Sequence, residues 1–252
     1  MKTLVNTAPY VLELQDWPIP AYGPEDLLVR VKACAICGSD IKGYSGKTGR
    51  RQPPIVMGHE ASGVVEAVGD KVTRFAPGDR VTFDSTIYCL RCPYCLTGHY
   101  NLCENRQVLG VSEGTYRRHG AMAEYVVVPQ WIAVQMPEHL TFAQAALVET
   151  VSIGVHAANR TPLQLNDLVA IIGAGGVGLV ALQAMRLKGA GRLVITDLSP
   201  ARLELALRLG ADVALRADEP DLLGRLRAAL GGRGADVAIE AVGIQTTVDT
   251  AL

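Results

Sequence analysis

The sequence predicts an α/β protein in two parts, a β-rich domain over residues 1–154 and a doubly wound parallel sheet over residues 155–252. Two observations predict this class. Short apolar segments separated by Gly and Pro fill the first part, which is typical of short strands joined by turns. From about residue 141, apolar segments of strand length alternate with segments of helix length, which indicates a parallel sheet with crossover helices.

The first part contains four segments with the composition of strands, at 27–33, 63–68, 80–83 and 123–128. Turn signals separate them. Gly69-Asp70 ends the second segment, and Pro77-Gly78-Asp79 precedes the third. Repeated short strands at this spacing predict a compact β-rich domain.

The change of pattern begins with a predicted helix at 141–147, for which Thr141 is a candidate N-cap. The segments that follow are predicted strands at 168–172, 192–196, 213–215 and 236–240 and predicted helices at 177–188, 200–209 and 222–230. The sequence ends just after the expected start of one more helix, so we expect the sheet to be incomplete at its C-terminal end.

A glycine-rich turn joins the first of these strands to its helix. The residues of the predicted G-x-G-x-x-G turn are Gly173, Gly175, Gly176, Val177 and Gly178. A turn of this kind lets a pyrophosphate approach the backbone at a helix N-terminus. Asp197 ends the next strand about twenty residues later, where a carboxylate accepts ribose hydroxyls and repels a 2′-phosphate. The pattern therefore predicts NAD as the cofactor. Arg202 is a candidate contact for the adenosine, and an ordinary surface arginine is an equal alternative.

Five of the six cysteines suggest metal binding at two places, and Cys34 is expected to be a buried small hydrophobic residue. Cys89, Cys92, Cys95 and Cys103 follow the spacing C-x2-C-x2-C-x7-C, and four thiolates complete the tetrahedral shell of Zn²⁺. Cys37 lies upstream of the Gly58-His59-Glu60 step. A ligand set that mixes cysteine, histidine and carboxylate leaves one coordination position of the metal for water or substrate. One closed and one open site together indicate a zinc enzyme.

Composition excludes several other classes. The 24 basic and 25 acidic residues nearly cancel, and the basic residues are scattered, so no electrostatic footprint for nucleic acid is present. The apolar run at 168–185 carries the glycines of the turn, which indicates a strand and turn rather than a membrane span. Cysteines spaced for metal, without a visible export signal, favour a reducing cytoplasm.

The motifs together resemble the zinc-dependent medium-chain alcohol/polyol dehydrogenase family. The matching stretches are Cys34-Ala35-Ile36-Cys37-Gly38-Ser39-Asp40, Met57-Gly58-His59-Glu60-Ala61-Ser62-Gly63, Pro77-Gly78-Asp79-Arg80-Val81, the four-cysteine lobe, Ala123-Glu124-Tyr125, and Glu149 followed by Ile153-Gly154-Val155-His156. The resemblance implies a GroES-like zinc domain followed by a Rossmann domain. It is greatest to the sorbitol dehydrogenase branch, because Glu149 stands where alcohol dehydrogenases usually carry a third cysteine.

The resemblance also implies roles for individual residues. Cys37 and His59 are expected to bind the catalytic zinc, and either Glu60 or Glu149 to complete its shell. Ser39 is expected to accept the alcohol proton, and Asp40 to orient the ligands. Val242 is expected to contact the cofactor. Lys42 occupies the position of a relay histidine in some relatives, which leaves the proton's exit route open.

The expected reaction transfers a hydride between a polyol or secondary alcohol and NAD, and gives the ketose or ketone. Within the family, a threonine- or butanediol-type dehydrogenase is the alternative. Outside it, the alternatives are a non-catalytic zinc-stapled nucleotide-binding protein and a zinc-ribbon nucleic-acid module, which the open metal site and the charge distribution disfavour. We expect a small-molecule substrate, no nucleic-acid or membrane partner, and a homodimer or homotetramer.

Overall fold

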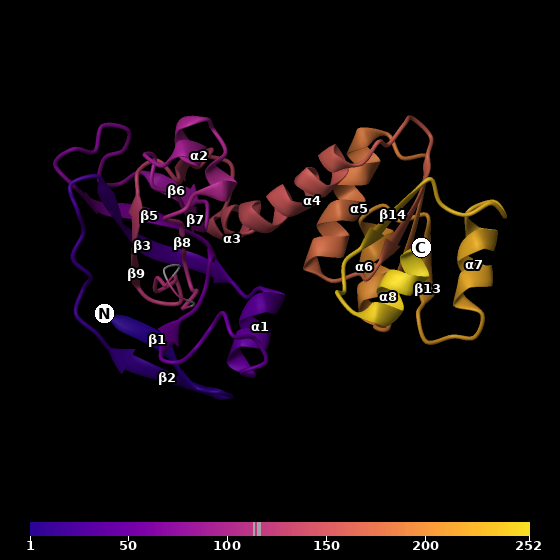
Figure 1. The fold of residues 1–252 in the computed structure, drawn as a ribbon, viewed down its shortest axis with the longest axis horizontal. Coiled ribbons are helices and arrows are strands. Elements are labelled where there is room, and N and C mark those ends of the chain that lie inside the picture. Colours follow the sequence, from indigo (N-terminus) through magenta and orange to yellow (C-terminus); the bar gives the residue numbers. More distant parts are fainter. Residues whose placement is uncertain (113, 115–116) are drawn as a thin grey trace. The chain divides into compact units, whose positions relative to one another are not determined.

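The computed structural model describes residues 1–112, 114 and 117–252, which divide into two compact units, Met1–Glu149 and Thr150–Leu252. Figure 1 shows both units, with most of their elements labelled. The predicted α/β class is confirmed, because antiparallel sheets form the first unit and a parallel sheet forms the second. The boundary predicted at 154/155 lies within helix α4 (Val148–Arg160), which begins in the first unit and ends in the second.

The main sheet of the first unit has five antiparallel strands in the order β10-β6-β5-β3-β9. Their bounds are β3 (Asp26–Ala35), β5 (Glu60–Val68), β6 (Arg80–Phe83), β9 (Tyr125–Pro129) and β10 (Ala133–Gln135). Leu27 of β3 lies opposite Val128 of β9, and Val29 lies opposite Val126. These four side chains are buried in one core cluster, because alternate residues of a strand share a face.

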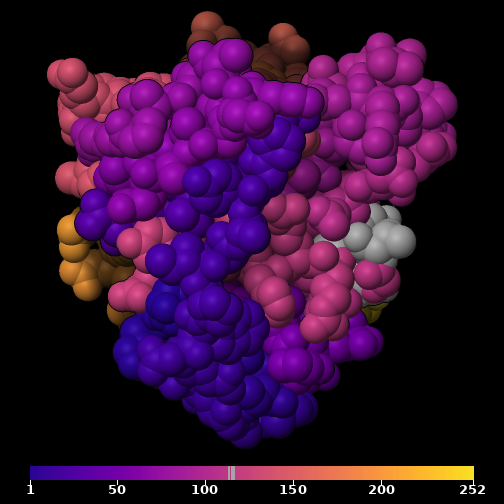
Figure 2. Space-filling view, turned by 90° about the vertical axis from the view of Figure 1, so that its left-hand side faces the viewer, coloured from indigo at the N-terminus to yellow at the C-terminus, as the bar shows by residue number. Residues whose placement is uncertain are grey.

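A second sheet contains strands that the sequence analysis did not identify. It has the order β2-β1-β4, with β1 (Lys2–Ala8), β2 (Val11–Asp16) and β4 (Ile55–Val56). Most residues of β2 are exposed, so the strand has little of the hydrophobic alternation that marks a half-buried strand. The N-terminal strands belong to the indigo surface in the lower part of Figure 2.

Short helices begin where the site residues lie. Helix α1 (Gly38–Tyr44) starts directly after Cys37 at the end of β3. Helix α3 (Phe142–Ala146) begins at Thr141, whose Oγ1 accepts a hydrogen bond from the backbone N–H of Gln144 at 3.2 Å. The predicted N-cap at Thr141 is therefore confirmed.

The second unit is built on four parallel strands in the order β13-β12-β11-β14. The strands are β11 (Leu168–Ile172), β12 (Arg192–Asp197), β13 (Val213–Arg216) and β14 (Val237–Glu240), and the helices between and after them are α5 (Gly176–Lys188), α6 (Pro200–Arg208), α7 (Leu222–Ala229) and α8 (Gln245–Ala251). Each strand and helix predicted from the alternating pattern is present, with bounds that differ by one residue or less.

Both faces of this sheet are buried. Val169 and Ile171 of β11 pack in a cluster that includes Leu182 of α5 and Ala206 of α6. The residues that alternate with these along the strands, such as Ile172, point to the other face of the sheet and pack in a second cluster with side chains of α7 and α8. Helices on two faces are what distinguishes a doubly wound sheet from a half-exposed one. In the described part of the chain, every helix is too short or too polar to cross a bilayer.

Candidate metal and cofactor sites

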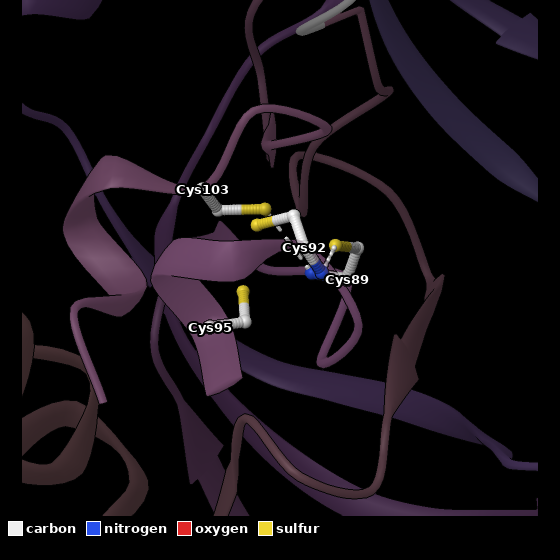
Figure 3. A group of neighbouring side chains, drawn as sticks. All are labelled: Cys89, Cys92, Cys95 and Cys103. Carbon is white, nitrogen blue, oxygen red and sulfur yellow. Dashed lines mark hydrogen bonds between the residues drawn. The ribbon is translucent and has the colours of Figure 1, made fainter. Parts of the chain in front are cut away.

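Four cysteine side chains gather in one lobe of the first unit: Cys89, Cys92, Cys95 and Cys103. Their sulfur atoms all lie within 4.8 Å of one another, and Figure 3 shows them around a common centre. A tetrahedral zinc ion with bonds of about 2.3 Å holds its sulfur ligands about 3.8 Å apart. The spacing and the chemistry of this donor set therefore fit zinc.

The lobe lies between strands β7 (Thr86–Ile87) and β8 (Gln107–Val108), which pair and close its base. Its buried cluster consists of cysteine side chains together with the half-buried Tyr88, whose ring stacks on Tyr100 at a centroid distance of 4.3 Å. Sulfur atoms fill the centre that aliphatic side chains fill in an ordinary small domain. A metal ion held by the four thiols would give the lobe a physical reason to be ordered.

Protons compete with a metal for these thiols. Hydrogen bonding by the backbone N–H groups of Arg91 and Cys92 lowers the pKa of the Cys89 thiol to about 6. Burial raises the pKa of the Cys95 thiol to about 12. Zinc binds the thiolate, so metal binding here must expel the proton of Cys95.

A second, mixed cluster brings together Cys37, His59 and Glu60, whose ligand atoms also lie within 4.8 Å of one another. The pairing of β3 with β5 builds it. Ala35 lies opposite Glu60 in that register, so the residues that follow β3 meet the residues at the start of β5. His59 and Glu60 are buried and Cys37 is half-buried, so a cysteine, an imidazole and a carboxylate converge with little exposure to solvent. This donor set fits a zinc ion that keeps one position open.

Asp40 lies behind this cluster. Its Oδ2 accepts a hydrogen bond from the backbone N–H of Cys37 at 3.1 Å, and its Oδ1 lies 3.5 Å from His59 Nδ1. Asp40 thus touches two members of the cluster without belonging to it. A carboxylate on the far nitrogen of a metal-binding histidine fixes the ring's tautomer and orientation. The arrangement is the one expected for an orienting residue.

Arg51 was not identified in the sequence analysis. Its Nε donates to Asp40 Oδ1 at 3.2 Å and its Nη2 donates to Ser39 Oγ at 2.9 Å. No local pattern marks this residue, because its partners lie 11 and 12 positions earlier in the chain. Only the folded loop after α1 brings its guanidinium to the cluster.

These contacts set the charges of the cluster. Burial lowers the pKa of His59, but hydrogen bonds to Asp40 and Cys37 outweigh that effect and raise it to about 10. A hydrogen bond from His59 in turn lowers the pKa of Cys37. Although burial raises the pKa of Asp40, its contacts with His59 and Arg51 hold it below its usual value. A metal ion that binds His59 must therefore displace the proton that these contacts stabilise on its ring.

A cavity of about 690 Å³ opens beside the mixed cluster and is lined by Ser39, His59 and Glu149, among others. Ser85 Oγ donates to Glu149 Oε1 at 3.4 Å. Burial raises the pKa of Glu149, and the nearby charge of Glu60 adds to the rise. Glu149 lies outside the group of three ligand atoms, but it lines the same cavity as His59.

The predicted glycine turn lies between β11 and α5 in the second unit. Gly173 has a positive φ of 103°, which a residue with a side chain adopts only with strain. A Cβ on Gly178 would lie 1.8 Å from the carbonyl oxygen of Gly173, so only glycine permits this approach of helix and strand. Gly176 and Val177 begin α5, whose first N–H groups and positive dipole end suit a phosphate.

Asp197 ends β12, and its side chain is mostly buried. Its Oδ2 accepts from the backbone N–H of Ala174 at 2.8 Å, and its Oδ1 accepts from the N–H of Ser199 at 2.8 Å. The carboxylate therefore ties the glycine turn to the end of β12. Each oxygen keeps a further acceptor position for a ribose hydroxyl. Arg202 lies 3.8 Å from Asp197 Oδ2 through Nη1.

A second cavity, of about 560 Å³, lies at the carboxyl ends of these strands. It brings together Gly173, Gly175, Asp197, Arg202 and Val242, all of them predicted cofactor residues. Its remaining wall includes residues that the sequence analysis did not identify, among them Ser199, Ile244, Thr246, Thr247 and Thr250. For the part of this wall near the end of the sequence, the sequence analysis predicted only the start of a helix. The structure contains this helix as α8.

Comparisons with known proteins match both units. The family model described as "Alcohol dehydrogenase GroES-like domain" matches residues 23–138, and that described as "Zinc-binding dehydrogenase" matches residues 176–252. A sorbitol dehydrogenase of Bacillus subtilis (strain 168) is 37% identical over all of this chain and 71% of its own length.

Two further proteins show the range of the similarity. An L-threonine 3-dehydrogenase of Symbiobacterium thermophilum is 38% identical over 93% of this chain and 66% of its own length. The solved structure of a zinc-binding dehydrogenase from Sinorhizobium meliloti 1021, bound to NADP, superposes with a TM-score of 0.89 at 33% identity, and covers 99% of this chain and 72% of that one.

The four-cysteine lobe should depend on its metal. We expect Cys92→Ser to lower the zinc content by one ion per chain and to make the lobe sensitive to proteolysis, because three thiolates no longer close the shell. Cys34→Ser, which removes a thiol outside both clusters, is the matched control. Elemental analysis and limited proteolysis check this, and an unchanged zinc content in Cys92→Ser would contradict it.

Zinc binding at the mixed cluster should release a proton from His59. The pKa of His59 is raised to about 10, so at neutral pH the ring is protonated until the metal displaces the proton. Apparent zinc affinity should therefore rise with pH below that value, by about tenfold per unit for each proton released. Calorimetry in buffers of different protonation enthalpy counts the protons. Asp40→Asn should reduce the count, and a count independent of Asp40 would contradict the assignment.

Proposed function

Because the chain belongs to the family of zinc-binding alcohol dehydrogenases with a GroES-like domain, we propose that it is a zinc-dependent oxidoreductase. It transfers a hydride between a polyol or other secondary alcohol and NAD, and gives the ketose or ketone. The observation that carries this proposal is the cavity in which Ser39 and Glu149 lie beside His59 of the mixed cluster.

The residues present fit two zinc ions of different kinds. The four cysteines would hold the structural ion, and Cys37, His59 and Glu60 would hold the catalytic one. Zinc in a site with an open position lowers the pKa of a hydroxyl group that binds there. Glu149 is the alternative carboxylate, since its position near His59 and Glu60 lets it approach the same centre.

Ser39 is the group that relays the proton of the substrate alcohol: its Oγ takes up that proton while its own hydroxyl proton passes to solvent in the cavity, so the side chain stays neutral. Ser39 lines the cavity, and Arg51 donates to its Oγ, so one lone pair of the hydroxyl is engaged and the other can face the substrate. Asp40 orients His59 through Nδ1. Transfer of the proton to a positioned side chain contributes about 10²–10⁴ to the rate of such reactions.

The second unit binds the cofactor. The N–H groups at the start of α5 meet the pyrophosphate, and Gly173 and Gly175 allow it to approach the backbone. Asp197 accepts the ribose hydroxyls. NAD supplies the acceptor for the hydride at its nicotinamide ring. Homo-oligomerisation and a cytoplasmic location remain predictions from the sequence.

A threonine-type dehydrogenase is the second candidate, favoured by the 38% identity to an L-threonine 3-dehydrogenase. The two candidates share the zinc and cofactor chemistry and differ in substrate. A panel of polyols, 2,3-butanediol and L-threonine separates them.

The zinc-loaded protein should reduce NAD with at least one polyol of that panel. Ser39→Ala should lower kcat by about 10²–10⁴ without loss of zinc, because Ser39 accepts the proton but does not belong to the ligand set. Ser45→Ala, at the C-terminal end of α1, is the control. Absence of NAD reduction with every alcohol, at two zinc ions per chain, would refute the proposed activity.

The protein should prefer NAD to NADP. Asp197→Ser should raise the KM for NAD and reduce the preference for NAD over NADP. The substitution removes the carboxylate that accepts the ribose hydroxyls, and it also removes the hydrogen bond that holds Ala174 of the glycine turn. Glu204→Ser removes a carboxylate from the exposed face of α6 and should change neither value. Kinetics with both cofactors provide the check, and a wild-type preference for NADP would show that Asp197 has another role.

A further inference from the structure

Arg51 is a buried charge at the mixed cluster. Only 6% of its surface is exposed, and its ion-pair partner Asp40 is buried more deeply, at 2%. Besides its bonds to Asp40 and Ser39, its Nη2 lies 3.5 Å from His59 Nδ1. One guanidinium therefore reaches the expected proton acceptor, the orienting carboxylate and a metal-binding imidazole.

The fold makes room for this side chain. A Cβ on Gly43 would lie 2.3 Å from Cδ of Arg51 and 2.8 Å from its Cβ, so helix α1 accommodates Arg51 only because residue 43 is glycine. Gly43 itself is buried. Burial of an ion pair is weak evidence for stability, because the desolvation cost is comparable to the attraction gained. A contribution to folding stability is therefore not a sufficient explanation for the buried contacts of Arg51.

We propose that Arg51 is a positioning residue for the reaction, an inference that rests on the proposed function. Its guanidinium is a rigid planar fork, so the donor to Asp40 and the donor to Ser39 are held at a fixed separation. The fork aligns the Ser39 hydroxyl, with one lone pair engaged, toward the cavity. Through Asp40 it also fixes the ring of His59.

A lysine at this position could not do the same. Its ammonium group is a single point charge on a flexible stem and cannot present two donors at a fixed separation. Arg51→Lys keeps the charge beside Asp40 and removes the fork. This variant therefore separates positioning from simple neutralisation of the carboxylate.

The test measures zinc release and turnover in the same variants. Arg51→Lys and Arg51→Ala should release the zinc of the mixed cluster to a chelator about 10–100-fold faster, as loss of an outer partner of a metal ligand does, while the four-cysteine site keeps its rate. For substrates of the wild type, kcat should fall by a similar factor with the KM for NAD unchanged. Added guanidinium ions should restore part of the kcat of Arg51→Ala, which a merely structural role would not produce.

Two further variants make the result decisive. Gly43→Ala keeps Arg51 and displaces it, so it should reproduce the faster release even if an Arg51 variant folds poorly. Arg30→Gln removes an exposed arginine of β3 that pairs with Glu66, and should change neither rate. Unchanged zinc release in Arg51→Lys and Gly43→Ala overturns the proposal. If the wild type binds two zinc ions but oxidises no alcohol, the proposed function fails, whereas the release rates still decide the role of Arg51.

Discussion

The register between β3 and β5 is the constraint on which the first unit's site depends. Ala35 lies opposite Glu60, and Cys34 opposite Ala61, at the end of a long antiparallel pair. This pairing sets Cys37, two residues beyond β3, against His59 and Glu60. A slip of one residue would turn Glu60 to the other face of the sheet and separate the ligands. The buried residues farther along both strands, Leu27, Val29 and Val65, hold the register because a slip would expose them.

The sequence predicted the second unit more completely than the first. In β11 and α5 the hydrophobic pattern, the glycine turn and the strand-helix alternation all agree, so the bounds could be predicted closely. Strand β2 carries most of its residues in solvent and has no such pattern. Helix α1 is short and contains two glycines, which lowers its intrinsic helix propensity, and its start depends on the bond between Asp40 and the Cys37 N–H.

Among the site residues, too, those with a clear sequence pattern could be predicted and those without one could not. The spacing of the cysteines and the Gly58-His59-Glu60 step predicted residues that the structure brings together in two clusters. Arg51 could not be predicted, because its role comes from a loop that returns to α1 and from the space above Gly43. Asp197 was predicted as a ribose acceptor. Its bonds to Ala174 and Ser199 give it a second task, holding the turn to β12, which no spacing in the sequence reveals.

The closed metal site also shapes the open one. Tyr88, Tyr100 and Arg106 belong to the lobe of the four cysteines, and all three line the cavity beside His59. Tyr100 lies in the short helical turn just before Cys103, and its ring is stacked on Tyr88. Since the lobe has sulfur at its centre in place of an aliphatic core, a metal ion held by the cysteines would also keep this wall ordered. In the proposed reaction, the four-cysteine site would therefore contribute by fixing one side of the cavity beside His59, without touching the reacting atoms.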